Sequence, residues 1–231
     1  PGAEPVHRQA GHAVAGPVDA ATFLRDHAGS EILVIAHTRA AADDLVRGLD
    51  TGSLGVHRVT LAMLAHDLAT QAMADRGLSP VPRLGMEALA ARAAYSARSE
   101  LKYFSPVAAM PGFARALAST LHDLRLAGVS PAALRKRGGA GADLARLLEA
   151  YESELEHRKL ADRAALFALA AENAAAGTHR LLRLPLLLLC ASPEDDPSGR
   201  LLREVARRAP SILAISLAGD PRNSALASLL E

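Results

Sequence analysis

The strongest constraint on the fold is the run Ile32-Leu33-Val34-Ile35-Ala36, which is apolar at every position and rich in β-branched residues. A short apolar run without alternation predicts a strand that is buried on both faces, as in a parallel sheet. Thr38 follows it as the expected N-cap of a helix. A second strand is predicted at residues 56–59, and Thr60 is expected to cap the helix after it. This alternation of strands and helices predicts a parallel α/β unit.

Strand patterns return near the end of the chain. Two further apolar runs, at residues 184–190 and 211–217, are predicted strands, with a helix between them at about 198–208. We expect all four strands to share one mostly parallel sheet. The prediction is a discontinuous α/β domain made of residues 1–76 and 177–231.

Residues 77–176 have helical periodicity and no strand-like run, so they are predicted to form an all-helical insertion. Apolar side chains recur there at helical spacing, at Phe113, Leu117, Leu121 and Leu124. Pro111 precedes them and is suited to the first turn of a helix. Residues 135–141 are expected to form a basic, glycine-rich loop.

The composition limits the classes of function. Hydrophobic residues make up 50% of the 231 residues and charged residues 22%, which predicts a packed core. The formal net charge is only +1, so any contact with DNA must rest on local basic patches. The single cysteine, Cys190, excludes a disulfide framework, and its place in a predicted strand indicates an inert core thiol. The nine histidines lack the spacing of metal ligands, so neither a metal nor another cofactor is expected.

No sequence feature points to a membrane. The longest unbroken apolar run, Leu184–Ala191, is far shorter than the ~20 residues that a membrane helix needs. The N-terminus lacks the charged and then apolar pattern of a signal peptide, so we expect a cytoplasmic protein with no membrane partner. The chain begins without Met and ends at Glu231 within a predicted helix, so we expect it to be part of a longer protein.

The turn after the first strand is a candidate binding site. The segment from Ile32 through Ala42 resembles the strand-to-helix segment of UvrD/RecB-type superfamily-one helicases, in which a Phe-Thr-Asn-Lys-Ala-Ala-like turn touches single-stranded DNA. Thr38 matches the family's threonine, His37 stands at its aromatic position and Arg39 at its Asn position. The resemblance implies that these three residues contact DNA, and helix N-termini with Thr side chains are suited to phosphate.

Thr60 matches the first residue of the next family segment, usually Thr-Phe-His-Ser-Phe, although Ala62 replaces its histidine. By the same resemblance, Thr60 is a further expected DNA contact. The alternative for Thr38 and Thr60 is a purely structural role as helix caps.

The nucleotide site of the family is expected to be vestigial. Residues 16–22 resemble a decayed Gly-Pro-Gly-Ser-Gly-Lys-Thr loop. The residues that match are Gly16, Pro17 and Thr22. Ala21 replaces the lysine that would neutralise phosphate charge, and two of the glycines are also lost. An unrelated Gly-Pro turn before a helix is the alternative.

The second half of the chain repeats this pattern. The strand at residues 184–190 resembles the family strand that ends in Asp-Glu, but Ala191 and Ser192 follow it here. In the family that Asp holds Mg²⁺ and the Glu activates water. Asp220 and Asn223 resemble a Gly-Asp-x-x-Gln-Ser segment, with Asn223 in place of the glutamine that senses the γ-phosphate. No catalytic residue is assigned, and we expect no ATP hydrolysis.

Three further groups of residues have two interpretations each. Lys102-Tyr103-Phe104 could stack a nucleic-acid base, or both rings could be buried against neighbouring helices. Arg135-Lys136-Arg137 could contact phosphate or form a solvated basic loop. Glu194-Asp195-Asp196 could bind a cation or form a solvated acidic loop.

Within the insertion, residues 112–129 and 160–166 resemble helical segments of AddB- and AdnA-like helicase-nucleases. The order and spacing of the strand-end segments around this insertion support the resemblance. The resemblance implies a P-loop NTPase (RecA-like) parallel sheet that is interrupted by an all-helical insertion. It also implies a non-hydrolysing, DNA-binding domain of a larger DNA-repair exonuclease that acts on double-strand breaks, with the nuclease outside this chain. The implied partners are DNA, bound weakly, the remaining domains of the parent chain and a second helicase-nuclease subunit. The alternatives are a protein-interaction scaffold with no DNA binding and an active NTPase with an unorthodox loop.

Overall fold

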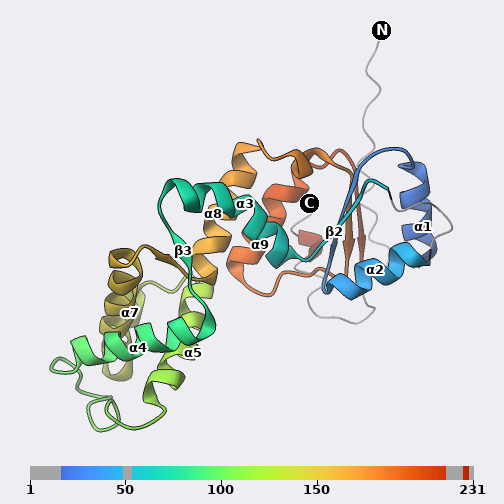
Figure 1. The fold of residues 1–231 in the computed structure, drawn as a ribbon. Helices are drawn as coiled ribbons and strands as arrows, with labels where there is room; N and C mark the ends of the chain where they lie inside the picture. Colours follow the sequence, from blue (N-terminus) through green and yellow to red (C-terminus); the bar gives the residue numbers. More distant parts are fainter. Residues whose placement is uncertain (1–16, 49–53, 217–225, 229–231) are drawn as a thin grey trace. The chain divides into compact units, whose positions relative to one another are not determined.

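The computed structural model describes residues 17–48, 54–216 and 226–228 (Figure 1). These residues divide into two compact units. Unit 1 consists of the described parts of Pro1–Ala69, Phe167–Glu194 and Ser198–Glu231, and unit 2 consists of Thr70–Leu166 and Asp195–Pro197. The main division falls inside two helices, α3 (Leu61–Asp75) and α8 (Arg163–Ala176), which contribute residues to both units. The boundaries expected from the sequence, at 76/77 and 176/177, lie instead at the ends of these helices.

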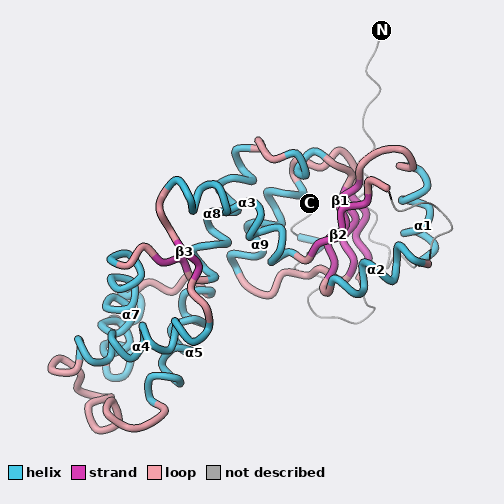
Figure 2. The backbone as a smooth tube through the Cα atoms, in the orientation of Figure 1, coloured by secondary structure: helices cyan, strands magenta, loops and turns pink. Residues whose placement is uncertain are grey.

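Unit 1 is built on a four-stranded parallel sheet with the strand order β2-β1-β5-β6. Its strands are β1 (Ile32–Ala36), β2 (Val56–Val59), β5 (Leu186–Leu189) and β6 (Ile212–Ile215), drawn in magenta in Figure 2. The prediction of four strands in one parallel sheet is confirmed. β1 is buried at all five positions and has a strand on each side, with Val34 opposite both Arg58 and Leu187.

Helices lie on both sides of this sheet. In Figure 1, α1 (Pro17–Asp26) and α2 (Arg39–Arg47) are on one side, and α9 (Asp196–Ala206) is on the other. Alternate strand residues point to the side of α1 and α2, where Ile32, Val34 and Leu187 form a core with Leu24 and Ala42. A strand between two helical layers must be apolar at every position, which explains the unbroken apolar run of β1.

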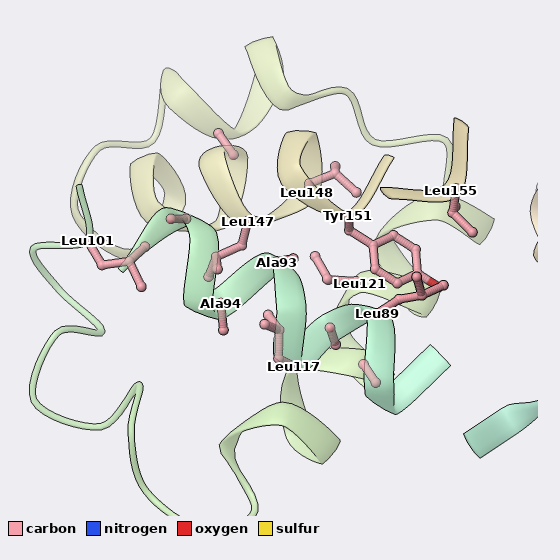
Figure 3. Close-up of a cluster of buried hydrophobic side chains, with 14 of the residues drawn as sticks. Leu89, Ala93, Ala94, Leu101, Leu117, Leu121, Leu147, Leu148, Tyr151 and Leu155 are labelled. Atoms are coloured by element: carbon pink, nitrogen blue, oxygen red, sulfur yellow. The ribbon is translucent and has the colours of Figure 1, made fainter. Parts of the chain in front are cut away.

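Unit 2 is mainly helical. Its helices are α4 (Arg83–Ala97), α5 (Phe113–Leu126), α6 (Pro131–Arg135) and α7 (Gly139–His157). Leu89 of α4, Leu117 and Leu121 of α5, and Leu147 and Tyr151 of α7 are buried in one core between these helices (Figure 3). Among the helices that the structure describes, none combines the length and the apolar character needed to span a membrane.

A short second sheet in unit 2 was not predicted. β3 (Ser79–Pro80) pairs in parallel with β4 (Leu160–Ala161), so the start and the end of the helical unit meet. Strands of two residues are too short to produce the alternation or the apolar run by which strands are identified in a sequence.

Two boundaries in unit 2 also differ from the expectation. α5 begins at Phe113, after Gly112 with a φ of 88°, so Pro111 precedes the helix instead of lying in its first turn. The basic loop expected at residues 135–141 is reduced to residues 136–138, because α6 and α7 extend into it from both sides.

Candidate nucleic-acid interface at the strand ends

The sheet of unit 1 has a point at which its connections diverge. β1 and β5 are neighbours, but the chain continues from β1 to β2 and from β5 to β6, which lie on opposite sides of this pair. The loops at the carboxyl ends of β1 and β5 therefore separate, and open α/β sheets bind their ligands at such points. Residues 37–38 follow β1 and residues 190–194 follow β5, so these loops and the turn after β2 outline the candidate site.

Thr38 and Thr60 begin the two helices that follow β1 and β2. The side-chain oxygen of Thr38 accepts a hydrogen bond from the N–H of Ala41 at 3.2 Å, and that of Thr60 accepts one from Met63 at 3.2 Å. The capping role that the sequence left open is thus present at both positions, and each hydroxyl still has a proton to donate. Because β1 and β2 pair in parallel, the two helix starts lie at the same edge of the sheet. The first N–H groups of a helix have no intrahelical partner and are suited to an anion.

Two arginines flank these helix starts and share one carboxylate. The side chain of Arg39 is half exposed, and its Nε lies 3.9 Å from Oδ2 of Asp43. Nη1 of Arg58 on β2 lies 3.4 Å from the other oxygen of Asp43. Exposed ion pairs contribute only about 0–1 kcal/mol, so a phosphate can replace Asp43 as the partner of Arg39 at little cost. Arg58 was not predicted from the sequence. Its only distinguishing feature there is its position two residues before Thr60.

His37 is exposed on the turn between β1 and α2. Its backbone N–H donates to the carbonyl of Leu189 at 3.1 Å, which joins this turn to the end of β5. Three of the four expected DNA contacts, His37, Thr38 and Arg39, therefore lie on one turn at the divergence point, and Thr60 lies on the neighbouring strand end.

The segment that resembles a nucleotide-binding loop is helical. α1 begins at Pro17, so Pro17 through Thr22 form its first turns. A phosphate-binding loop needs an open, glycine-rich backbone before its helix, and residues 17–22 do not have this conformation. Gly16, Asp220 and Asn223, the other residues of the expected vestigial site, lie outside the described residues.

The end of β5 differs from the expectation for Cys190. The strand ends at Leu189, and Cys190 is half-buried after it, so the prediction that Cys190 lies in a buried strand is wrong. Its φ is 50°, which is uncommon for a residue other than glycine, and its N–H donates to the carbonyl of Ile215 at 2.7 Å. Ala191 and Ser192 follow it, so no carboxylate comes directly after this strand.

The acidic residues after β5 lie just before and at the start of α9. Asp196 is the first residue of this helix, and the buried Ser198 accepts the N–H of Glu194 at 3.2 Å. Asp195 lies 3.7 Å from Nη2 of Arg163. Within the described part of the chain, no group of His, Cys, Asp and Glu side chains could hold a metal ion.

The aromatic and basic candidates of unit 2 have different outcomes. Tyr103 is exposed, whereas Phe104 is half-buried near Phe113, so the interpretation that buries both rings is wrong for Tyr103. Arg135 donates a hydrogen bond to Glu149, which makes it an ion-paired surface residue.

Comparison of the chain with models of protein families and with curated proteins gives no match. The structure defines a class of fold, an open parallel α/β sheet with a helical unit inserted between β2 and β5. The strand ends of that sheet are the basis for the functional interpretation.

Proposed function

We propose that this chain is a non-hydrolysing, helicase-like domain that binds DNA at the strand ends of unit 1. The observation that carries the proposal is the pair of helix starts capped by Thr38 and Thr60, at one edge of a parallel sheet. Arg39 and Arg58 add two cations, and His37 adds an exposed ring. Two helix N-termini, two hydroxyl donors and two cations form a surface that is suited to consecutive phosphates.

The resemblance to UvrD/RecB helicases supports the same assignment, because the family turn that touches single-stranded DNA corresponds to residues 37–39. By this proposal the sheet is a P-loop (RecA-like) sheet, and the chain belongs to a larger cytoplasmic DNA-repair exonuclease of the AddB/AdnA kind that acts on double-strand breaks. The nuclease centre lies outside this chain. The partners are DNA, the remaining domains of the parent protein and a second helicase-nuclease subunit.

The proposed domain binds DNA without hydrolysing ATP. Ala21 stands where the family has its lysine, and the helical segment Pro17–Thr22 has no loop of N–H groups to surround phosphates. Ala191 and Ser192 replace the carboxylates that place Mg²⁺ and water. Losing these groups removes both charge neutralisation and metal placement from the transition state.

Fluorescence anisotropy with a dye-labelled oligonucleotide at about 50 and 200 mM salt tests the DNA site, because phosphate contacts make affinity salt-dependent. Arg39→Ala should weaken binding and lower the slope of log K against log salt by about 0.7–0.9, the contribution of one phosphate. The matched control is Arg47→Ala, since Arg47 is an exposed arginine at the other end of α2, 2.9 Å from Asp44. An equal loss in both variants would mean that general positive charge, and not the strand-end site, binds DNA.

A second candidate function is a scaffold that binds a partner protein and no DNA. It is favoured by two large apolar side chains that are exposed on one loop of unit 2, Val107 and Met110, where the N–H of Met110 donates to the carbonyl of Val107 at 2.9 Å. Exposed apolar groups that lie together mark protein contacts. No oligonucleotide binding at about 50 mM salt, together with co-elution of this chain with the separately expressed remainder of the parent protein, would support the scaffold.

A further inference from the structure

The loop at residues 101–112 of unit 2, between α4 and α5, is held by one buried carboxylate. Oδ2 of Asp143 on α7 accepts hydrogen bonds from the backbone N–H groups of Lys102, Tyr103 and Phe104, at 2.9, 2.7 and 3.0 Å. Hydrogen bonds to an ionised acceptor are about twice as strong as neutral ones, so three of them fix the backbone here. The loop is thus ordered at the point where two aromatic side chains leave it.

The two aromatic rings have opposite environments. Phe104 packs against the core of unit 2, and its ring centre lies 5.9 Å from that of Phe113. Tyr103 makes an edge-to-face contact with Phe104, with 5.1 Å between the ring centres and an angle of 84°, and it remains 62% exposed. An exposed ring on a fixed backbone loses little conformational entropy when a ligand stacks on it.

The chain around the start of this loop adds a second exposed ring and two cations. Tyr95 of α4 is 67% exposed, and the guanidinium carbon of Arg98 lies 4.1 Å from the centre of its ring. Lys102 is exposed as well. The acidic residue among them, Glu100, lies 3.5 Å from Nε of Arg146, whose Nη1 lies 3.6 Å from Asp143. Arg146 is therefore shared by two carboxylates, and the charges of Arg98 and Lys102 are added to this group.

We propose that residues 95–105 bind single-stranded nucleic acid, with a base stacked on Tyr103 and phosphates paired with Lys102 and Arg98. Aromatic side chains that stack bases, combined with nearby cations, are the recurrent means of binding single strands without sequence preference. A duplex does not suit this surface, because its bases are stacked on one another and present no free face to a tyrosine ring. The surface uses no residue of the strand-end site in unit 1, so it does not rest on the function proposed above.

Binding of the full chain to dye-labelled oligo(dT), and to a duplex of the same length, tests this surface. We expect the single strand to bind more tightly, and we expect Tyr103→Ala to weaken its binding by about tenfold, the effect of losing one stacked base. Tyr103→Phe keeps the ring and should bind like the wild type. Met110→Ala changes another exposed apolar side chain of the same loop, and as the matched control it should also bind like the wild type.

Tyrosine fluorescence is a direct measure of stacking between a bound strand and Tyr103. The chain has three Tyr and no Trp, and Tyr151 is buried, so the emission that a bound strand can quench by stacking comes from Tyr95 and Tyr103. Oligo(dT) should quench this emission in the wild type. The quenching should be smaller in Tyr103→Phe, although that variant still binds, because the reporting ring has been replaced.

Unchanged binding by Tyr103→Ala, or equal affinity for duplex and single strand, would overturn the proposal. So would the absence of oligo(dT) binding at low salt, and the exposed rings would then be assigned to a protein partner. Arg39→Ala separates this surface from the strand-end site. If only Arg39→Ala loses binding, the strand binds at the unit 1 site and not at residues 95–105. If only Tyr103→Ala loses binding, the strand binds at residues 95–105 and not at the unit 1 site. An unchanged Tm of Tyr103→Ala would show that its loss of binding is not a loss of folding.

Discussion

Nε of Arg125 lies 2.5 Å from Oδ2 of Asp162, in a buried ion pair that joins α5 to the start of α8. Nη2 of Arg125 lies 3.2 Å from the other carboxylate oxygen, which also accepts the N–H of Ala165 at 3.0 Å, so Asp162 caps α8. Burial lowers the pKa of Arg125, but the hydrogen bonds and charges of Asp162 and Glu152 more than offset this and raise it above its ordinary value. The guanidinium therefore stays charged inside unit 2 and depends on its carboxylate partners.

Asp162→Ala should destabilise the protein by about 3–5 kcal/mol, because it leaves a buried arginine without its main partner and removes the cap of α8. Glu152 also binds Arg125, at 2.6 Å, but its side chain is 40% exposed against 1% for Asp162. Glu152→Ala should therefore cost about 1 kcal/mol or less. Urea unfolding followed by circular dichroism compares the two variants, and equal costs would contradict this assignment of roles.

The raised pKa of Tyr151 predicts that the protein loses stability at alkaline pH. Burial, and then the negative charge of Asp162, raise the pKa of Tyr151 from 10.0 to about 12. The folded protein therefore keeps this phenol neutral at pH values where the unfolded chain ionises it. The resulting stability is fully present below pH 10 and is lost as the pH rises toward about 12.

The measurement for Tyr151 is denaturant unfolding at about pH 9 and pH 11, on either side of the ordinary tyrosine pKa. The wild type should lose more stability than Tyr151→Phe over this interval, because the variant has no phenol to ionise. Identical losses in the two proteins would show that Tyr151 does not contribute to the alkaline transition.

The helix caps at the strand ends should each contribute measurable stability. Thr60→Ala removes the acceptor for the N–H of Met63, and Thr38→Ala removes the acceptor for the N–H of Ala41. Each change should cost about 1 kcal/mol, whereas Thr→Ser at the same positions keeps the oxygen and should restore most of the loss. Thermal melts report the effect, and alanine variants with an unchanged Tm would argue against these capping bonds.

The chain should hydrolyse no ATP, with or without single-stranded DNA. Ala21 provides no cation for the phosphates, and the helix at Pro17–Thr22 provides no loop around them. A phosphate-release assay is the measurement. A DNA-stimulated rate that Thr22→Ala abolishes would show that these residues form a working nucleotide site and that the proposed loss of hydrolysis is wrong.

Predictions from local patterns succeeded where neighbouring residues decide the outcome. The apolar run at Ile32–Ala36 forms one of the two inner strands, and Thr38 and Thr60 cap helices, because burial pattern and capping act within a few residues of the chain. The prediction for Tyr103 failed because its exposure depends on the path of a loop whose backbone is bound by Asp143, 40 residues away in the sequence. Cys190 was misplaced because the strand ends at Leu189, one residue before the end of the predicted strand.

The sequence by itself determined the four strands of the parallel sheet, the helix starts at Thr38 and Thr60 and the mainly helical character of the middle of the chain, since these depend on side-chain periodicity and on caps within one turn. Only the tertiary structure decided the strand order β2-β1-β5-β6 and the sharing of Asp43 between Arg39 and Arg58. It also decided that Asp162 meets Arg125, 37 residues away. Packing helices onto both faces of a sheet brings together residues whose separation along the chain carries no information about their contact.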